Sequence, residues 1–415
     1  MCKYKINVLI YGGEMKKFEE ASANNTNPKW DKIISREEEI YIRPNELRSS
    51  FERDYNRIVH TNAYRRLKHK TQVFFSPKND HICTRIEHVN HVESISYTIA
   101  NYLGLNTELT KAIAVAHDIG HSPFGHKGER ELSEIAKRDL GYTLWHEKSG
   151  LHFVDNIELL EDERSNSFNL NLTYAVRDGI ISHCGEVDQN GIKPREEAID
   201  LNIYTMPNQY APYTWEGCVV KVADKISYIG RDIEDAISLN LLDEEQKDEL
   251  ASIIETTGFD NLNNSIIIHE LIQDLCANSN PETGIMLSDS YFSMLNRIKQ
   301  FNYKNIYLCK RMNATNRYFH LVINEIYETL KQCYNGTKTK EELNKMKRFY
   351  PITTQGFMEW IEKYWDLTKR EETNYKNKVI YFIERKEDYF RAILDYITGM
   401  TDNYAIELYN EIISF

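Results

Sequence analysis

Apolar residues recur at helical spacing along almost the whole chain, and this periodicity constrains the fold more than any other feature of the sequence. Only nine prolines interrupt 415 residues, and the alternation that is typical of half-buried strands is weak everywhere. The sequence therefore predicts a mainly α-helical protein with at most a minor β-hairpin, which we place at about Ile192–Ile203.

Several helices can be placed where capping residues and apolar faces coincide. Gly104 can end a helix through a left-handed cap, Asn106 or Thr107 can begin the next one, and Ser122-Pro123 prevents simple continuation beyond Gly120. The chain after Asp243 is helical and aromatic, with little recognisable chemistry. The clearest predicted helices are Arg48–Lys70, Thr84–Leu103, Thr107 to about Gly120, and Trp215–Leu239.

The chain is longer than the roughly 100–200 residues of a common domain. We expect a loose N-terminal extension over residues 1–28, a core over residues 29–242, and a helical C-terminal region over residues 243–415 that packs on the core. Gly12-Gly13-Glu14 precedes Met15, and its codons could encode a ribosome-binding sequence. We therefore hypothesise that translation begins at Met15, which an intact Met1 terminus in a mass spectrum of native protein would contradict.

Charge and cysteine usage exclude several classes of function. The chain has 51 basic and 63 acidic residues, a net charge of −12, so nucleic acid is not expected as its main ligand. A basic pocket for a small polyphosphate stays open, and Arg65–Lys70 is the densest basic cluster, although a solvated helix face explains it equally well. Seven dispersed cysteines without a C-x-x-C pair indicate reduced thiols. No apolar stretch is long enough to span a bilayer, so we expect a cytoplasmic protein without membrane attachment.

Histidines are concentrated in one part of the chain: eleven of the thirteen lie between His60 and His183. The most informative pair is His117-Asp118, which falls at a predicted helix end. Adjacent side chains cannot share a face in mid-helix, but at a terminal turn both can converge on one ion. Imidazole and carboxylate suit Mn²⁺, Fe²⁺ or, less ideally, Mg²⁺. Alone, such a dipeptide is more often structural, with a packed or capping histidine.

Two further residues would complete a metal site: His88 on the preceding helix and Asp224 on a later one. The order His88, His117-Asp118, Asp224 resembles the defining pattern of the HD superfamily. Several flanking segments also look like the bacterial dGTPase-type triphosphohydrolases of that superfamily. The resemblance runs from about Trp30 to Ile412, with a divergent stretch near 245–345. The matching segments are 51–58, 65–67, 70–74, 84–88, 116–129, 221–236 and 395–402.

The resemblance implies an HD-domain helical fold with additional C-terminal helices. It implies an enzyme that hydrolyses deoxynucleoside triphosphates between the 5′ oxygen and the α-phosphate, releasing a deoxynucleoside and inorganic triphosphate. Members of the family act on dGTP alone or on several dNTPs, often under a nucleotide activator, and base choice stays open here. It further implies an even-numbered homo-oligomer, a hexamer or a tetramer, and a divalent metal held by His88, His117, Asp118 and Asp224.

The same resemblance assigns roles near the metal. His126 and Glu129 stand three residues apart, so a helix beginning there would put them on one face. The resemblance makes them a catalytic histidine–carboxylate couple, and a surface ion pair is the alternative. It also implies two sets of substrate contacts. The phosphate contacts are Arg85, His121, His146 and Lys225. The sugar contacts are Tyr228, which leaves no room for a 2′-hydroxyl, and Asp232 and Gln72, which accept from the 3′-hydroxyl.

Alternatives for the function and for two of the residue roles stay open. The chain could be another HD phosphohydrolase, such as a 5′-nucleotidase or a cyclic-dinucleotide phosphodiesterase, or a nucleotide-sensing HD scaffold without turnover. The long flanking motifs and the complete ligand set favour the triphosphohydrolase. His121 could be a packing histidine, and Asp395–Asp402 is expected to pack rather than to line the pocket.

Overall fold

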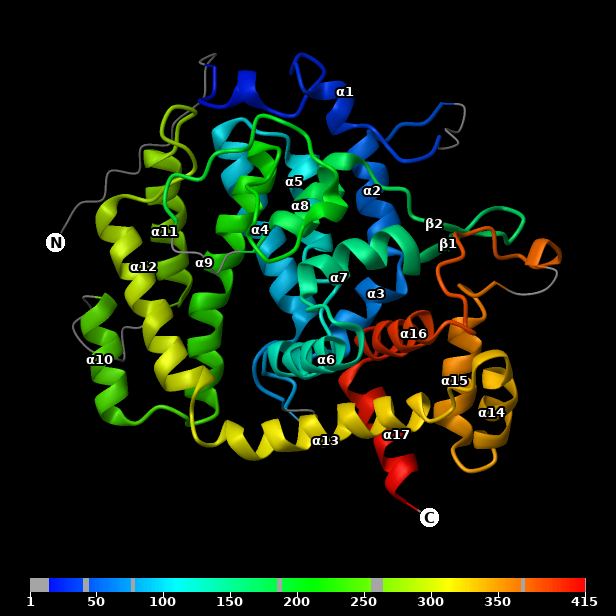
Figure 1. The fold of residues 1–415 in the computed structure, drawn as a ribbon. Helices are drawn as coiled ribbons and strands as arrows, with labels where there is room; N and C mark the ends of the chain where they lie inside the picture. Colours follow the sequence, from blue (N-terminus) through cyan, green and yellow to red (C-terminus); the bar gives the residue numbers. More distant parts are fainter. Residues whose placement is uncertain are drawn as a thin grey trace.

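A computed structural model gives the arrangement of the chain and confirms the mainly helical prediction (Figure 1). It describes residues 15–39, 45–75, 79–184, 189–254, 264–366 and 370–414. The N-terminal elements are α1 Trp30–Ile33, α2 Ser50–Val59, α3 Asn62–Arg66, α4 Arg85–Leu103, α5 Thr107–Ala116, α6 Gly125–Leu140, α7 His146–His152, β1 Leu159–Glu161, β2 Ser167–Asn169, α8 Tyr174–Ser182 and α9 Trp215–Ser238. The later elements are α10 Glu244–Ile254, α11 Asn264–Asn278, α12 Asp289–Asn302, α13 Met312–Lys331, α14 Thr339–Met346, α15 Pro351–Ile361, α16 Lys386–Thr398 and α17 Asp402–Ile413.

Helix α5 is the centre of the N-terminal half. Its second half is a run of small and branched apolar residues, Ala112–Ala116, and every one is fully buried. Asn106 caps the helix by accepting hydrogen bonds from the amides of Glu108 and Leu109. The helices that surround it are α2, α4, α8 and α9. The residue that directly follows α5 therefore lies in the interior of the protein.

Two long helices flank α5 and determine what meets its C-terminal end. Helix α4 begins with a capping box between Thr84 and Glu87 and ends at Gly104, whose φ of 87° is the left-handed conformation that glycine favours. Helix α9 is capped by Thr214 and runs for 24 residues. Both predicted helices are thus confirmed to within a residue, and both pack against α5 and against each other.

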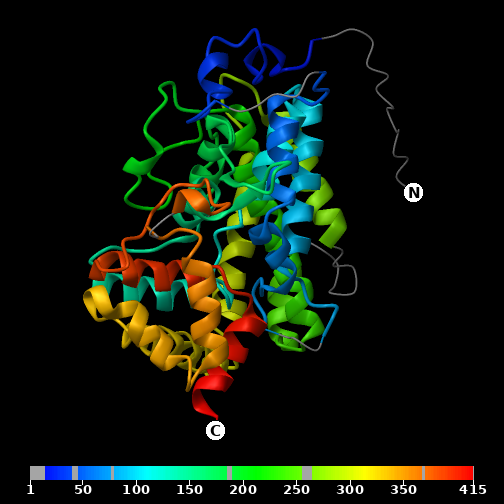
Figure 2. The same cartoon turned by 90° about the vertical axis from the view of Figure 1, so that its right-hand side faces the viewer.

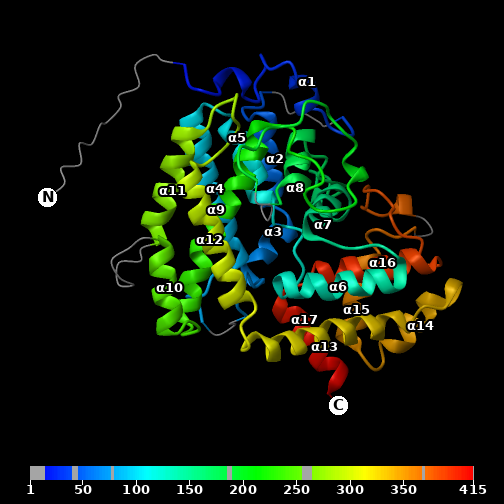
Figure 3. The same cartoon turned by 60° about the vertical axis from the view of Figure 1, so that its left-hand side comes forward.

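The C-terminal half forms a second layer around this centre. Helices α9, α10, α11 and α12 stand side by side as near-parallel columns (Figures 1 and 3). Helix α13 then runs beneath α6 toward α14 and α15, and α16 and α17 return against α6 and α13 (Figures 1 and 2). One apolar core continues through both halves, so the division at residues 242/243 stays a prediction.

Three local predictions are corrected. The hairpin is formed by β1 and β2, with Leu159 opposite Asn169. It does not lie at Ile192–Ile203, where Ile192 instead makes an isolated bridge to Ile285. The predicted helix Arg48–Lys70 is broken at Thr61, which caps α3 with its hydroxyl. The described part of the expected loose extension is packed, since Phe18 is fully buried and contacts Trp215 edge-on; residues 1–14 lie outside the described chain.

Candidate metal centre

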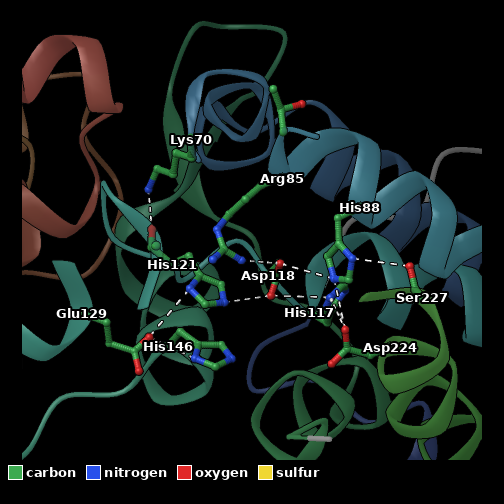
Figure 4. A network of polar contacts seen from close by, with 12 residues as sticks. Lys70, Arg85, His88, His117, Asp118, His121, Glu129, His146, Asp224 and Ser227 are labelled. Atoms are coloured by element: carbon green, nitrogen blue, oxygen red, sulfur yellow. Dashed lines mark hydrogen bonds and ion pairs between the residues drawn. The ribbon is translucent and has the colours of Figure 1, made fainter. Parts of the chain in front are cut away.

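Three helices bring His88, His117 and Asp224 together, and with Asp118 we call these residues the metal corner (Figure 4). His88 lies on α4, His117 ends α5, and Asp224 lies in the middle of α9. Oδ1 of Asp224 is 3.1 Å from Nε2 of His88 and 3.9 Å from Nε2 of His117. Ligand atoms of these three residues all lie within 4.8 Å of one another. Asp118 completes the corner, with its oxygens 3.5 Å from His117 Nε2 and 3.8 Å from His88 Nε2.

The hydrogen bonding of His117 fits a metal ligand. Its Nδ1 donates to the carbonyl oxygen of Ala114 at 2.6 Å, which leaves Nε2 as the unprotonated nitrogen. That Nε2 is buried and has no hydrogen-bond partner among the described residues. A buried lone pair without a partner is costly in a folded protein, and a divalent cation would satisfy it. The imidazole and carboxylate donors of the corner suit Mn²⁺ or Fe²⁺ better than Ca²⁺.

Asp118 links the metal corner to a buried cation. Its Oδ2 accepts from Nη1 of Arg85 at 2.7 Å, and its Oδ1 lies 3.0 Å from Nε2 of His121. Burial alone would raise the pKa of Asp118, but His121, His117 and Arg85 outweigh it and hold the pKa well below its usual value. Asp118 is therefore a carboxylate at neutral pH, as a metal ligand must be.

Arg85 is only 1% exposed and keeps unused donors. Within the described chain, its Nε and Nη2 are buried and find no acceptor. A guanidinium carries five N–H donors in a planar fork that matches phosphate oxygens. The unused donors beside Asp118 therefore indicate a place for an anion next to the metal corner.

A second group of side chains lies on the other side of Asp118, and we call it the turn group: His121, His126, Glu129 and His146. Their ligand atoms also lie within 4.8 Å of one another. His121 stacks on His146 with ring centroids 3.8 Å apart. Glu129 accepts a hydrogen bond from Nδ1 of His146 at 3.0 Å. His126 is the exposed member of the group. Burial would lower the pKa of His146, but Glu147 and Glu129 outweigh it and raise this pKa to about 10.

The turn group depends on an unusual backbone. Phe124, which precedes α6, has a φ of 63°, in the left-handed region that a bulky residue rarely adopts. Gly120 allows α7 to approach, because a Cβ there would lie 2.1 Å from the amide nitrogen of Gly150 and 2.2 Å from the carbonyl oxygen of His146. Both features place the imidazole of His146 against that of His121.

Residues from the C-terminal end of the chain hold this turn. Asp402, at the start of α17, accepts hydrogen bonds from the amide of Phe124 at 2.8 Å and from the amide and hydroxyl of Thr71 at 2.8 and 2.5 Å. The buried ammonium of Lys70 donates to the carbonyl oxygens of His121 and, at 2.9 Å, of Thr398. We call these contacts of Asp402 and Lys70 the C-terminal clamp. The Asp395–Asp402 stretch therefore packs, as predicted, and its packing shapes the turn that carries His121.

Two of the predicted sugar contacts, Tyr228 and Asp232, lie on α9, and the third, Gln72, lies between α3 and α4. Asp232 is buried and accepts from the hydroxyl of Tyr307, a residue of the divergent stretch. Burial raises the pKa of Asp232 to about 7. Gln72 is buried, and its Oε1 has no partner among the described residues. Tyr228 is half-buried on α9, while Lys225 lines a narrow cavity against α11 and α12.

His183 was not assigned a role from the sequence, yet it is part of the same interior. It follows α8 directly, is 1% exposed, and its ring centroid is 5.0 Å from that of His117 and 5.4 Å from that of His146. The concentration of histidines between His60 and His183 was the available signal. No spacing rule links it to His117, because the contact depends on how α8 packs against α5.

The helical fold and the histidine–aspartate corner define the chain as an HD phosphohydrolase, a class whose HD domain binds divalent metal ions. The family model of the HD domain matches residues 85–229 of the sequence, and the family model of the phosphohydrolase-associated domain matches residues 358–411. Within the described residues, no helix has the length and apolar character needed to cross a membrane.

Comparison with whole proteins places the chain in one family within the class of HD phosphohydrolases. A deoxyguanosinetriphosphate triphosphohydrolase-like protein of Rickettsia felis is 32% identical over 385 residues, which cover 89% of this chain and 93% of the relative. One of Caldanaerobacter subterraneus subsp. tengcongensis is 33% identical over 371 residues, covering 88% and 86%. The chain belongs to this family of deoxyguanosinetriphosphate triphosphohydrolase-like proteins, which confirms the resemblance found in the sequence.

Proposed function

We propose that the protein hydrolyses deoxynucleoside triphosphates to a deoxynucleoside and inorganic triphosphate. The observation that carries the proposal is Arg85, a buried guanidinium with unused donors beside the metal corner. An anionic ligand must supply the missing acceptors, and a triphosphate does so. The names of the relatives support dGTP as one substrate.

The residues of the chain take the following roles in this proposal. The chemistry that a divalent ion, Mn²⁺, Fe²⁺ or Mg²⁺, supplies when held by the metal corner is Lewis-acid polarisation of an α-phosphate oxygen. Arg85 holds the phosphate through its free donors. His146, whose raised pKa keeps it protonated, donates to the phosphate chain; His121 stacks on it beside that chain, and Lys225 supplies further positive charge.

We assign the proton transfer of this hydrolysis to residues of the turn group. Hydrolysis joins a water oxygen to the α-phosphorus and breaks the bond to the 5′ oxygen, so the water loses one proton and the 5′ oxygen gains one. We assign this transfer to the couple His126 and Glu129, whose ligand atoms lie within 4.8 Å of each other. Glu129 also orients His146 by accepting from its Nδ1 at 3.0 Å.

Deoxyribose preference is assigned to α9 and to Gln72. Tyr228 lies against the sugar face and excludes a 2′-hydroxyl, and Asp232 accepts from the 3′-hydroxyl. The unpaired Oε1 of Gln72 can accept from the same hydroxyl. Tyr307 donates a hydrogen bond to Asp232 from the divergent stretch, so this stretch reaches the proposed sugar site. A nucleotide activator and an even-numbered assembly belong to the same proposal.

Chromatography of the products from each dNTP and rNTP, with Mn²⁺ or Mg²⁺ and with or without a second nucleotide, tests the function. We expect inorganic triphosphate and deoxynucleoside, with ribonucleotides turned over at least about tenfold more slowly. Nucleoside monophosphates as products would indicate a different HD phosphohydrolase, and nucleotide binding without turnover would indicate a scaffold.

A variant pair tests the role of Arg85. Arg85→Gln should lower kcat/KM for dNTPs by about a hundredfold, because it removes charge-assisted bonds to the phosphate. Arg130→Gln changes an exposed arginine on α6 and should leave the rate unchanged. Equal rates in both variants would contradict the phosphate role of Arg85.

A further inference from the structure

Where the turn after α5 meets α6, two consecutive residues lie in the left-handed region: Phe124, with a φ of 63°, and Gly125, with a φ of 60°. Glycine adopts this conformation readily, but a bulky side chain does not. Among the described residues, six that are not glycine have a positive φ, and all but Phe124 are asparagine or serine. The other five are Asn45, Ser165, Asn171, Asn208 and Asn240. A bulky residue stays in this conformation only when its surroundings hold it there.

The ring of Phe124 lies against the ring of Phe319, a residue of α13. The two rings are nearly parallel, with an interplanar angle of 8° and centroids 4.2 Å apart. Phe75 closes the group edge-on, with its centroid 5.5 Å from that of Phe319 and 6.0 Å from that of Phe124. Both stacked residues are buried. Because the backbone conformation of a residue sets the direction of its side chain, Phe124 keeps this contact only while its backbone stays left-handed.

Helix α13 is a firm support for this ring, because both sequence neighbours of Phe319 are attached to other helices. His320 donates from Nδ1 to Oε2 of Glu131 on α6 at 2.7 Å. Tyr318 packs edge-on against Tyr409 of α17, with ring centroids 6.0 Å apart. Figures 1 and 2 show α13 running beneath α6, with α17 beside it. The position of Phe319 is therefore set by helices that do not belong to the turn itself.

The turn that Phe319 contacts carries two members of the turn group: His121 lies three residues before Phe124, and His126 lies two residues after it. Phe319 has no role in the proposed function. We propose that Phe319 is a positioning residue for the hydrolysis: its ring holds Phe124 in the left-handed conformation and thereby sets the positions of His121 and His126. The expected effect on turnover rests on the proposed function, whereas the expected effect on the turn does not.

Amide hydrogen exchange of the full-length protein tests the effect on the turn without any turnover. The amide of Phe124 donates to Oδ1 of Asp402 at 2.8 Å and should exchange slowly in the wild type. Phe319→Leu keeps an apolar side chain but removes the ring, so this amide should exchange at least about tenfold faster while the amides of α4 and α9 stay unchanged. Phe349→Leu makes the same substitution at a residue that is 69% exposed and should exchange like the wild type. Unchanged exchange at Phe124 in folded Phe319→Leu would overturn the proposal; if that variant does not fold, Phe319→Met takes its place.

A double-mutant cycle tests the effect on turnover. Phe319→Leu should lower kcat for dNTPs about tenfold and change KM by less than about twofold, because Arg85 and Asp232, assigned to the phosphate and the sugar, lie outside the turn. Phe124→Gly removes the strain, since glycine adopts a positive φ freely, so adding Phe319→Leu to it should lower kcat no further. A wild-type kcat in Phe319→Leu, or a further loss in the double variant, would overturn the proposal. A wild type that hydrolyses no dNTP would instead refute the proposed function, and amide exchange would still decide whether Phe319 holds the turn.

Discussion

The metal corner and the turn group meet where Asp118 of the metal corner contacts His121 of the turn group, but they are built in different ways. The ligands of the metal corner project from α4, α5 and α9, three helices whose mutual packing is already fixed by the apolar core. The turn group lies on the turn after α5 and on the first turns of α6 and α7, and it depends on the left-handed Phe124 and on the C-terminal clamp. A site on packed helices is held in place by the packing of those helices. A site on a turn needs contacts from distant residues to hold it in place.

Asp118→Ala should give the largest effect, since this residue belongs to the metal corner and contacts the turn group through His121. Losing a metal ligand removes several kcal/mol of transition-state stabilisation, so the rate of dNTP hydrolysis should fall by about a thousandfold or more. Bound metal, measured by elemental analysis, should fall with it. The exposed Asp80→Ala is the control, and full activity of Asp118→Ala would refute the assignment.

Asp402→Ala should separate the two regions. It removes three hydrogen bonds that hold Phe124 and Thr71, so the turn group should shift while the metal corner stays in place. We expect kcat to fall by about 10- to 100-fold, because small misplacements of reacting groups are costly, with an unchanged metal content at the metal corner. The neighbouring exposed Asn403→Ala is the matched control. If metal is lost together with activity, the two regions are not independent.

Removing the metal should affect stability through the metal corner. A ligand that binds only the folded state adds about 2.7 kcal/mol when its concentration is a hundred times its Kd. Denaturant unfolding of the wild type with and without a chelator should show a loss of about this size. Asp224→Ala should unfold at the same denaturant concentration with or without chelator; a full metal effect in that variant would place the ion elsewhere.

Asp395 offers the mildest test of how the C-terminal half supports the turn group. Its Oδ2 accepts from Tyr381 at 2.6 Å and lies 3.0 Å from His152, the last residue of α7, whose first residue is His146. Burial would raise the pKa of Asp395, but His152 and Arg391 outweigh it and lower the pKa. A carboxyl with a depressed folded-state pKa stabilises the protein above its unfolded pKa, about 4, and that contribution is lost as the pH falls.

The free energy of unfolding of Asp395→Asn should therefore lie about 1–2 kcal/mol below that of the wild type at pH 7. The difference should shrink as the pH falls below about 4, where the carboxyl of the unfolded chain becomes protonated, and should vanish once the pH falls below the lowered pKa of the folded protein. Urea unfolding at several pH values measures it. A difference that does not change with pH would mean that the charge of Asp395 contributes nothing.

The sequence predicted the helices of the metal corner better than the contacts that hold the turn group. Gly104 is a local signal for the end of α4, and the bounds of both α4 and α9 were predicted to within a residue. The resemblance to the HD superfamily identified His88 and Asp224 as partners of His117, and the structure brings these residues together. Their role as metal ligands stays a prediction.

The remaining features depend on contacts that no local pattern reveals. The bond between Asp402 and Phe124 joins residues 278 positions apart, and the approach of His183 to His117 depends on how α8 packs against α5. The hairpin was misplaced because two three-residue strands give too weak an alternation to locate. Glu129 lies near His126, as their spacing predicted, but its hydrogen bond with His146 at the start of the next helix was not predicted, because it depends on how α7 packs against α6.

The C-terminal clamp has a consequence for biosynthesis. Thr71 and its partner Asp402 are separated by 331 residues, and a ribosome adds about 5–20 residues per second. A nascent chain can therefore assemble α4, α5 and α9, and with them the metal corner, roughly 8 to 33 seconds before α17 is synthesised and can hold the turn after α5. The turn group would therefore reach its final arrangement only after α17 has been synthesised, well after the metal corner.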